Sequence, residues 1–116
     1  KEKGAALTLV GKDVTFELVE SSLDGQEFRI QNSEFRIPLL GAHQIENAAT
    51  AYTALKVSGI PITDEQIQKG FSQVQWRARF EVARREPPVI FDSAHNQDSF
   101  AKLRETLDAY FPDKQV

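Results

Sequence analysis

The chain has 116 residues, a formal net charge of −3 and no cysteine, which fits one small domain or incomplete parts of two larger ones. The lack of cysteine excludes a disulfide scaffold and a thiolate metal site and is compatible with the cytosol, so we expect a cytoplasmic protein. The acidic balance offers no global basic field for nucleic acid, and no apolar run approaches the roughly 20 residues of a membrane span, so we expect no nucleic-acid or membrane partner.

Alternating apolar and polar residues predict a small antiparallel β meander over residues 5–40. The alternating apolar positions are Val14, Phe16, Leu18, Phe28, Ile30, Phe35, Ile37 and Leu39. Breaks fall at residues 11–13, 21–25 and 32–33, where Asp-Gly and Asn-Ser sequences favour turns because they tolerate positive φ or bond their own backbone. The charged side chains of this segment are expected on a solvated face, and we assign no chemistry there.

A helix is predicted over residues 42–58, because small and apolar residues recur there at helical spacing. The stripe consists of Ile45, Ala48, Ala49, Tyr52 and Leu55. We expect Gly59 to follow the helix, and Pro61 cannot continue it. The polar group in or just before the first turn is His43, Gln44, Glu46 and Asn47. Because helix N-termini have unpaired N–H groups and partial positive charge, this end suits a nucleotide.

A second helix is predicted over residues 64–75, with a complete start signal. Thr63 and Gln66 form a capping-box pattern, in which each side chain bonds the other's backbone N–H. Ile62 and Ile67 fit the hydrophobic staple that accompanies such a cap. The expected buried stripe consists of Ile67, Phe71 and Val74. These signals are structural, so we assign this helix no catalytic role.

Residues 76–88 are interpreted as a boundary between two parts of the chain. We expect a short strand to begin at Trp76. Adjacent Pro87 and Pro88 with flanking charges are typical of an ordered linker rather than of a core element, and we expect the strand to end there. The arginines at positions 77, 84 and 85 are expected to lie on the surface.

The apolar run at 89–91 predicts a buried strand, and the polar residues Asp92, His95 and Asn96 follow it closely. In open α/β sheets, ligands bind beyond the carboxyl ends of the strands, so these side chains are candidates for a ligand site. Asn96 suits an N-cap position, where its oxygen would accept the N–H of Ser99. The helix expected next has an apolar stripe of Phe100, Leu103, Leu107 and Tyr110. One strand and one helix cannot make a doubly wound domain, so we expect this part to be truncated.

Three separated motifs agree in order and spacing with one family. Residues 39–49 read LLGAHQIENAA, residues 76–81 read WRARFE and residues 92–96 read DSAHN. They resemble the L-G-x-H-Q-x-x-N-A, W-x-G-R-F-E and D-G-A-H-N motifs of the folylpolyglutamate synthase and dihydrofolate synthase family in the Mur ligase superfamily. The resemblance covers about residues 35–111, and H-Q rather than H-N favours this family over the Mur ligases.

The resemblance, together with the patterns above, implies an α+β fragment: a small antiparallel β meander plus two helices, then one strand-loop-helix unit from a truncated α/β domain. It places residues 1–76 in the C-terminal part of a central ATPase-type domain, residues 77–87 in an interdomain linker and residues 88–116 at the start of a C-terminal α/β ligase domain. The family binds ATP between these domains, so the chain would contribute the adenosine side of the ATP site.

By the same resemblance, the parent enzyme is an ATP-dependent ligase that adds L-glutamate to folate through an acyl phosphate, with Mg²⁺ as cofactor. The phosphate loop G-x-x-x-x-G-K-[ST] is absent from these 116 residues, and the family's magnesium ligands lie upstream. We therefore expect the chain alone to be inactive and to contain no catalytic residue. We also expect no metal ligand, because His43, His95 and Asp92 lack the close histidine pair typical of a metal site.

Carried over position by position, Asn47, Arg79 and Asp92 match the family's ATP-binding residues. A carboxamide suits the N6/N7 edge of adenine, a guanidinium suits phosphate, and a carboxylate can accept both ribose hydroxyls. His95 could contact the nucleotide or the incoming glutamate. The alternative that its side chain only packs within the loop has equal weight.

Each of these residues also has a structural interpretation. Asn47 can bond local backbone in the first turn of its helix. Arg79 can pair with Glu81 or Glu86, and Asp92 can cap a helix or pair with Arg79. Two other functions stay open as well: a Mur-type ligase fragment acting on a peptidoglycan precursor, and a non-catalytic nucleotide-binding or interaction domain.

The chain departs from the family motifs at three positions. Ala78 and Ser93 occupy positions where the family has glycine, and Gln97 replaces the usual proline after H-N. Ala78 and Ser93 restrict φ where glycine is free, which affects the expected hinge and the approach of backbone to a ligand.

Overall fold

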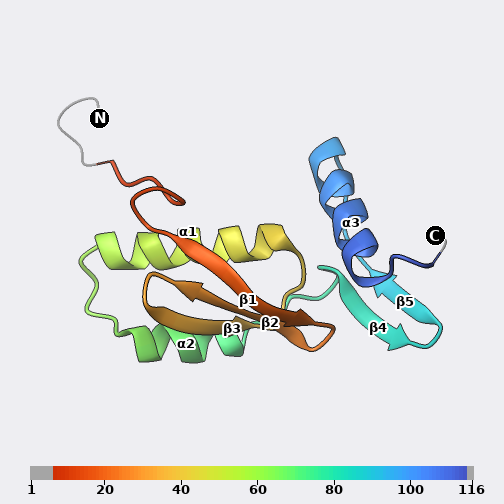
Figure 1. The fold of residues 1–116 in the computed structure, drawn as a ribbon, viewed down its shortest axis with the longest axis horizontal. Coiled ribbons are helices and arrows are strands. Elements are labelled where there is room, and N and C mark those ends of the chain that lie inside the picture. The colour runs from red at the N-terminus through yellow and green to blue at the C-terminus, as the bar shows by residue number, and fades with distance from the viewer. Residues whose placement is uncertain (1–6, 115–116) are drawn as a thin grey trace.

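The structure is a computed structural model that describes residues 7–114, and these residues form two antiparallel sheets and three helices. The elements are β1 (Phe16–Ser22), β2 (Gly25–Ile30), β3 (Ser33–Ile37), α1 (Ala42–Val57), α2 (Asp64–Ser72), β4 (Glu81–Arg85), β5 (Pro88–Phe91) and α3 (Gln97–Tyr110). The first sheet has the order β1-β2-β3, and β4 and β5 form the second. The described part of the chain is elongated, with the β4–β5 hairpin and α3 at the end opposite the loop between α1 and α2 (Figure 1). The α+β fold predicted from the sequence is confirmed.

One face of the three-stranded sheet packs on α1 and α2. Phe28 and Ile30 of β2 are fully buried, as the alternating pattern predicts. The ring of Phe35 on β3 lies 5.4 Å from Tyr52 of α1 and 5.6 Å from Phe71 of α2, measured between centroids. A single side chain thus contacts both helices, which places them on the same face and makes this the main core.

The strand β1 departs from the alternating pattern. Its pairing with β2 shifts between Leu18 and Glu20, so the strand contains an irregularity of the bulge type. Leu18 and Val19 are 52% and 49% exposed, although Leu18 pairs directly with the buried Phe28 and the period of two places it on the buried face. The chain also reverses at residues 31–32, with Gln31 at φ +54°, one position earlier than the predicted turn at 32–33.

Both predicted helices of the first half are present, with small differences at their ends. Gly59 follows α1 with φ +79°, as expected for a C′ residue. The capping box of α2 is formed: Thr63 Oγ1 accepts the Gln66 N–H at 3.2 Å, and Gln66 Oε1 accepts the Thr63 N–H at 2.9 Å. The helix ends at Ser72 instead of position 75, so Val74 lies beyond it.

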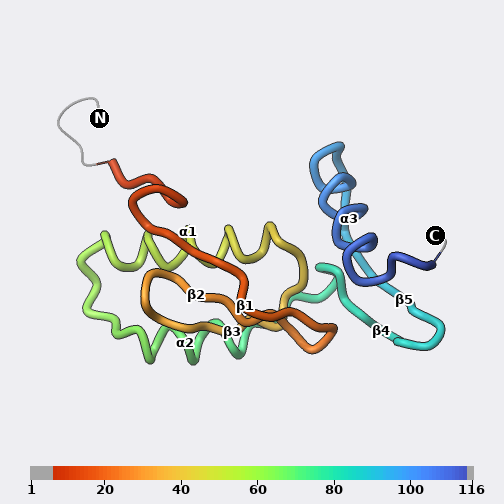
Figure 2. The backbone as a smooth tube through the Cα atoms, viewed as in Figure 1, coloured from red at the N-terminus to blue at the C-terminus, as the bar shows by residue number. Residues whose placement is uncertain are grey.

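The second half differs more from the prediction. The strand β4 begins at Glu81 and not at Trp76, because residues 77–80 form turns with left-handed Ala78 (φ +58°) and Phe80 (φ +47°). Figure 2 shows the chain passing from α2 through this segment into the hairpin. Pro87 lies in the tight turn between β4 and β5, and Pro88 begins β5, so the two prolines belong to an antiparallel hairpin.

The strand β5 is less buried than its apolar sequence predicts. Ile90 shares a cavity with Leu103 and Leu107 of α3, so it lies on the covered face of the hairpin. Phe91 points to the other face and is 54% exposed. Successive residues of a strand face opposite sides, and α3 covers only one of them.

Within residues 7–114, none of the helices combines the length and apolarity that a bilayer crossing needs.

Candidate nucleotide-binding site

A cavity of about 240 Å³ lies where the two halves of the described chain meet. It is bounded by the first half of α1, the 79–80 turn, the loop after β5 and the first turns of α3. Its lining residues are His43, Glu46, Asn47, Arg79, Phe80, Asp92, Ser93, Ala94, His95, Asp98, Ser99, Lys102, Leu103 and Thr106. The four residues that sequence analysis selects as candidates, Asn47, Arg79, Asp92 and His95, therefore all line one cavity.

Gly41 brings α1 and α3 together beside this cavity. A Cβ atom at Gly41 would lie 2.6 Å from Cε1 of His43 and 2.9 Å from Oγ1 of Thr106, and Gly41 has φ +112°. The buried side chain of Gln26 donates to the carbonyls of Leu39 and Gly41, both at 2.9 Å. Only glycine fits this close approach without strain, so the start of α1 is fixed against both the sheet and α3.

Asn47 is exposed at the mouth of the cavity, and its Nδ2 donates to Oε1 of Gln44 at 3.2 Å. This is the local bonding that its structural interpretation predicts, although the partner is a side chain and not backbone. A carboxamide has two N–H donors and one acceptor oxygen. The contact uses one donor, so Asn47 retains a donor and an acceptor for a ligand.

Arg79 stacks on Trp76, with its Cζ 4.0 Å from the centroid of the indole ring. The ion pairs among residues 7–114 do not include Arg79, so the predicted alternative of pairing with Glu81 or Glu86 is not what the structure shows. Glu81 instead accepts the N–H of Ala78 at 3.0 Å. Stacking on an aromatic face orients the guanidinium while leaving its charge unneutralised.

The carboxylate of Asp92 holds two backbone segments. Its Oδ2 accepts the Phe80 N–H at 2.9 Å, and its Oδ1 accepts the Ala94 N–H at 2.8 Å. The Ser93 N–H donates to the Ala78 carbonyl at 2.8 Å and adds to the same junction. Asp92 thus neither caps α3 nor pairs with Arg79. Each carboxylate oxygen can accept a second hydrogen bond, so the carboxylate keeps capacity for ribose hydroxyls.

The N-terminus of α3 is closed by a capping box between Asn96 and Ser99. Asn96 Oδ1 accepts the Ser99 N–H at 2.8 Å, which confirms the predicted cap, and Ser99 Oγ accepts the Asn96 N–H at 3.0 Å. The imidazole Nδ1 of His95 lies 3.1 Å from the Ser93 carbonyl. Since a carbonyl only accepts, this contact is a hydrogen bond when Nδ1 carries a proton.

Lys102 is not among the candidates selected from the sequence, and His43 appears there only in a polar group and in the metal site that is excluded. Burial lowers the pKa of His43, and the charges of Lys102 and Arg79 lower it further, whereas Glu105 and Asp92 act in the opposite direction. The surroundings of His43 are therefore dominated by desolvation and positive charge. Ser99, Lys102 and Thr106 lie three and four positions apart and therefore share one face of α3. The sequence alone does not show that this face lines the cavity, so it could not identify Lys102 as a site residue.

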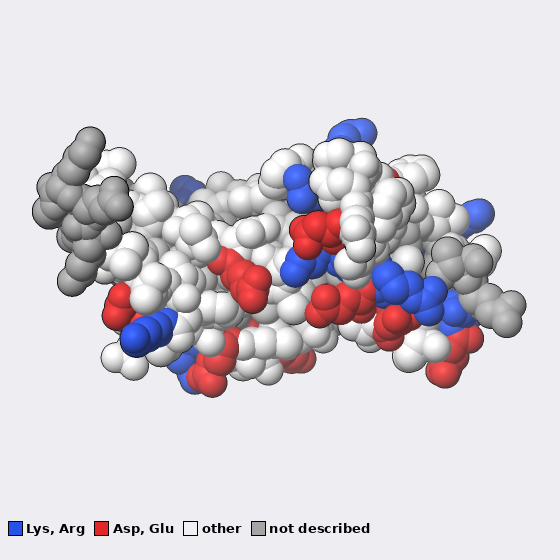
Figure 3. Space-filling view, turned by 90° about the horizontal axis from the view of Figure 1, so that it is seen from above, with Lys and Arg blue, Asp and Glu red and all other residues white. Residues whose placement is uncertain are grey.

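On the face shown in Figure 3, Lys and Arg side chains are interspersed with Asp and Glu. Within residues 7–114, no group of three or more His, Asp or Glu is arranged to hold a metal ion.

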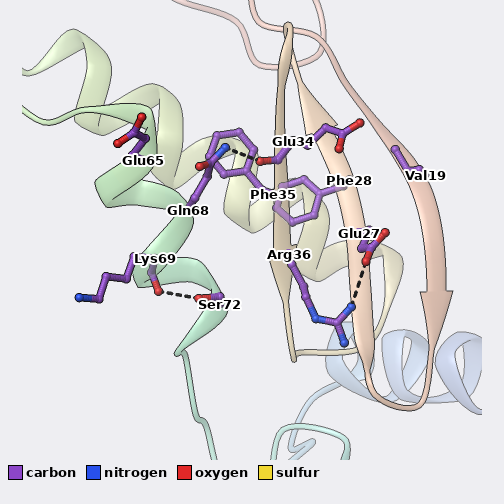
Figure 4. A pocket seen from close by; sticks show the side chains of 10 residues that line it. All are labelled: Val19, Glu27, Phe28, Glu34, Phe35, Arg36, Glu65, Gln68, Lys69 and Ser72. Carbon is purple, nitrogen blue, oxygen red and sulfur yellow. Dashed lines mark hydrogen bonds and ion pairs between the residues drawn. The ribbon is translucent and has the colours of Figure 1, made fainter.

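A larger groove of about 560 Å³ lies between the sheet and α2 (Figure 4). Several of its polar groups bind one another: Arg36 pairs with Glu27 at 3.3 Å, and Gln68 donates to the Glu34 carbonyl at 2.8 Å. The smaller cavity contains histidine, an arginine without an ion pair among the described residues and an exposed carboxamide, so it is the better ligand site despite its size.

Comparison with known proteins identifies a consistent group of relatives. The chain is 40% identical over 77 residues to a probable bifunctional folylpolyglutamate synthase/dihydropteroate synthase of Haloferax volcanii, covering 66% of this chain and 9% of that protein. It is 32% identical over 101 residues to the dihydrofolate synthase/folylpolyglutamate synthase of Bacillus subtilis, covering 79% and 24%. Among solved structures, an FPGS–AMPPCP–folate complex matches with a TM-score of 0.77 and 26% identity, covering 92% of this chain and 28% of that one.

No family model matches the chain. The chain spans about a quarter or less of the length of the curated relatives described above.

Proposed function

Since this chain belongs to the folylpolyglutamate synthase/dihydrofolate synthase family, we propose that its cavity binds ATP in a ligase that adds L-glutamate to folate. The observation that carries this proposal is the convergence of Asn47, Arg79, Asp92 and His95 on one cavity. The solved relative with AMPPCP and folate supports the same ligand class. We also propose a cytoplasmic location, in keeping with the sequence composition.

Each side chain has a proposed role at the nucleotide. Asn47 presents a donor and an acceptor that match the edge of adenine. Arg79, oriented by Trp76, contacts phosphate oxygens. Asp92 accepts hydrogen bonds from the ribose hydroxyls with the acceptor capacity that its two backbone contacts leave free. His95, which lines the same cavity, contacts the nucleotide or the incoming amine.

The proposed reaction has two steps. A folate carboxylate oxygen attacks the terminal phosphorus of ATP, which releases ADP and gives an acyl phosphate. The amine of glutamate then attacks the acyl carbon, loses a proton and expels phosphate, forming an amide. Magnesium would neutralise charge on the phosphates. The residues of this chain bind and orient the nucleotide. The phosphate-loop motif is absent from the 116 residues, and residues 7–114 contain no cluster arranged to hold a metal ion.

We further propose a domain boundary near residues 77–87, between a central part (1–76) and a C-terminal part (88–116). The left-handed residues Ala78 and Phe80 support a change of direction at 77–80. Because β4 pairs with β5, residues 81–85 are held to the C-terminal part, which favours the beginning of the interval as the flexible point.

Isothermal titration of the complete gene product containing these residues with AMPPCP tests the nucleotide site. Asn47→Ala should weaken binding by about 5- to 10-fold, the effect of losing a hydrogen-bonded pair of roughly 1 kcal/mol. Release of phosphate that requires both folate and glutamate tests the reaction. Activity only with a UDP-N-acetylmuramoyl peptide would favour the Mur-type alternative, and nucleotide binding without turnover on either substrate would favour a non-catalytic domain.

A further inference from the structure

Building on the nucleotide site proposed above, we propose that Lys102 of α3 is a second phosphate-binding cation, which acts together with Arg79. The two residues come from different elements, α3 and the turn before β4, and both line the same cavity. A phosphate chain bound there would contact both cations.

The position of Lys102 is well defined by its helix. Its backbone carbonyl accepts the hydroxyl of Thr106 at 2.8 Å, and Thr106 is 3% exposed beneath Gly41. This face of α3 is therefore held against the start of α1. The side chain of Lys102 is half-buried, and the residue lines the cavity together with Arg79.

The charge of Lys102 is not neutralised among the described residues. The ion pairs within residues 7–114 involve five other basic side chains, namely Arg29, Arg36, Lys56, Arg85 and Arg104. Asp98 and Glu105 lie four positions before and three positions after Lys102, where a surface lysine commonly pairs along the helix. Neither forms such a pair here.

The cavity is lined by these two cations and by the carboxylates of Glu46, Asp92 and Asp98. Neither cation has an ion pair among the described residues, so a bound phosphate chain would supply an anionic partner for both. His43 lines the same cavity, and both charges lower the pKa of its imidazole, whereas Glu105 and Asp92 raise it. Phosphate, with several anionic oxygens, can contact both cations at once.

The test uses the complete gene product and compares the binding of ATP and adenosine by titration calorimetry. Lys102→Gln should weaken ATP by about 10-fold or more, the usual effect of losing a hydrogen bond to a charged group. Adenosine has no phosphate, so its affinity should change by less than about twofold. Lys102→Arg should retain most of the ATP affinity, and Lys69→Gln on α2 is the matched control for loss of one positive charge.

Equal weakening of ATP and adenosine, or unchanged ATP affinity, would overturn the role of Lys102. A rise in KM for glutamate with unchanged ATP affinity would assign the cation to a carboxylate and also overturn the phosphate role. If the unmodified protein binds neither ATP nor adenosine, the nucleotide site itself is wrong, an outcome distinct from failure of Lys102 alone.

Discussion

The carboxylate of Asp92 accepts the backbone N–H of Phe80 at 2.9 Å and thereby joins the end of β5 to the turn that precedes β4. Phe80 has φ +47°, a conformation that a bulky residue rarely adopts without support. The other oxygen of Asp92 holds the Ala94 N–H. One acid thus organises both backbone segments from which Arg79 and His95 enter the cavity.

Asp92→Ala should therefore lower both stability and nucleotide affinity. We expect a loss of about 1–3 kcal/mol in the free energy of unfolding, because two N–H groups lose a charged acceptor. ATP binding should weaken by about 10- to 100-fold if the ribose contact is also lost. Asp92→Asn keeps one acceptor oxygen, so urea unfolding should show a smaller loss in its free energy of unfolding than in that of Asp92→Ala.

Comparison with 2′,3′-dideoxy-ATP separates the two roles of Asp92. The unmodified protein should prefer ATP over this analogue, and Asp92→Ala should lose most of that preference, since the analogue has no hydroxyls to bind. If the substitution weakens ATP and the dideoxy analogue by the same factor, Asp92 acts only through the backbone contacts to Phe80 and Ala94.

Replacement of Gly41 should be more destabilising than replacement of Gly59. Both have positive φ, but a Cβ at Gly41 would overlap His43 and Thr106, whereas nothing lies within 4 Å of one at Gly59. We expect Gly59→Ala to lower the free energy of unfolding by about 1–2 kcal/mol and Gly41→Ala by about 2–4 kcal/mol. Urea unfolding of both variants measures the difference. Equal losses would show that α1 and α3 do not pack as closely as described.

The capping residues of α2 and α3 should be distinguishable by their effect on the nucleotide. Thr63→Ala and Asn96→Ala should each lower the free energy of unfolding by about 1 kcal/mol. Only Asn96 lies beside the cavity, next to His95, so only its replacement should also weaken ATP binding. A large loss of ATP affinity in Thr63→Ala with unchanged stability would contradict the structural assignment of that cap.

The imidazole of His43 should titrate below the ordinary histidine range, because burial and the charges of Lys102 and Arg79 lower its pKa. The unfolded chain then binds the proton more readily, so the free energy of unfolding falls as the pH decreases through about 6.5. Thermal melts between about pH 7.5 and 5.5 should show a smaller decrease in Tm for His43→Gln than for the unmodified protein.

Nuclear magnetic resonance of the folded protein gives a direct measure of the same pKa. Lys102→Gln should raise the pKa of His43 by removing a nearby positive charge, and Lys69→Gln should leave it unchanged. A His43 that titrates above the ordinary range, or that ignores Lys102, would place the ammonium elsewhere.

The sequence by itself determined the features that depend on neighbouring residues. The caps at Thr63 and Asn96 and the left-handed Gly59 follow from contacts within a few positions, and the buried rings of Phe28 and Phe35 follow from a strand period of two. The family motifs also singled out Asn47, Arg79, Asp92 and His95, which the structure brings to one cavity.

Only the tertiary structure decided features that depend on distant parts of the chain. The pairing of β4 with β5 places Pro87 and Pro88 in a hairpin. Phe91 is exposed because α3 covers only the opposite face of that hairpin. The pairing of β4 with β5 also brings Phe80 to the carboxylate of Asp92, and the close approach of α3 to the start of α1 puts Lys102 and His43 in one cavity lining. Local patterns constrain a residue's own backbone and face, whereas its partners are set by close packing between segments far apart in sequence.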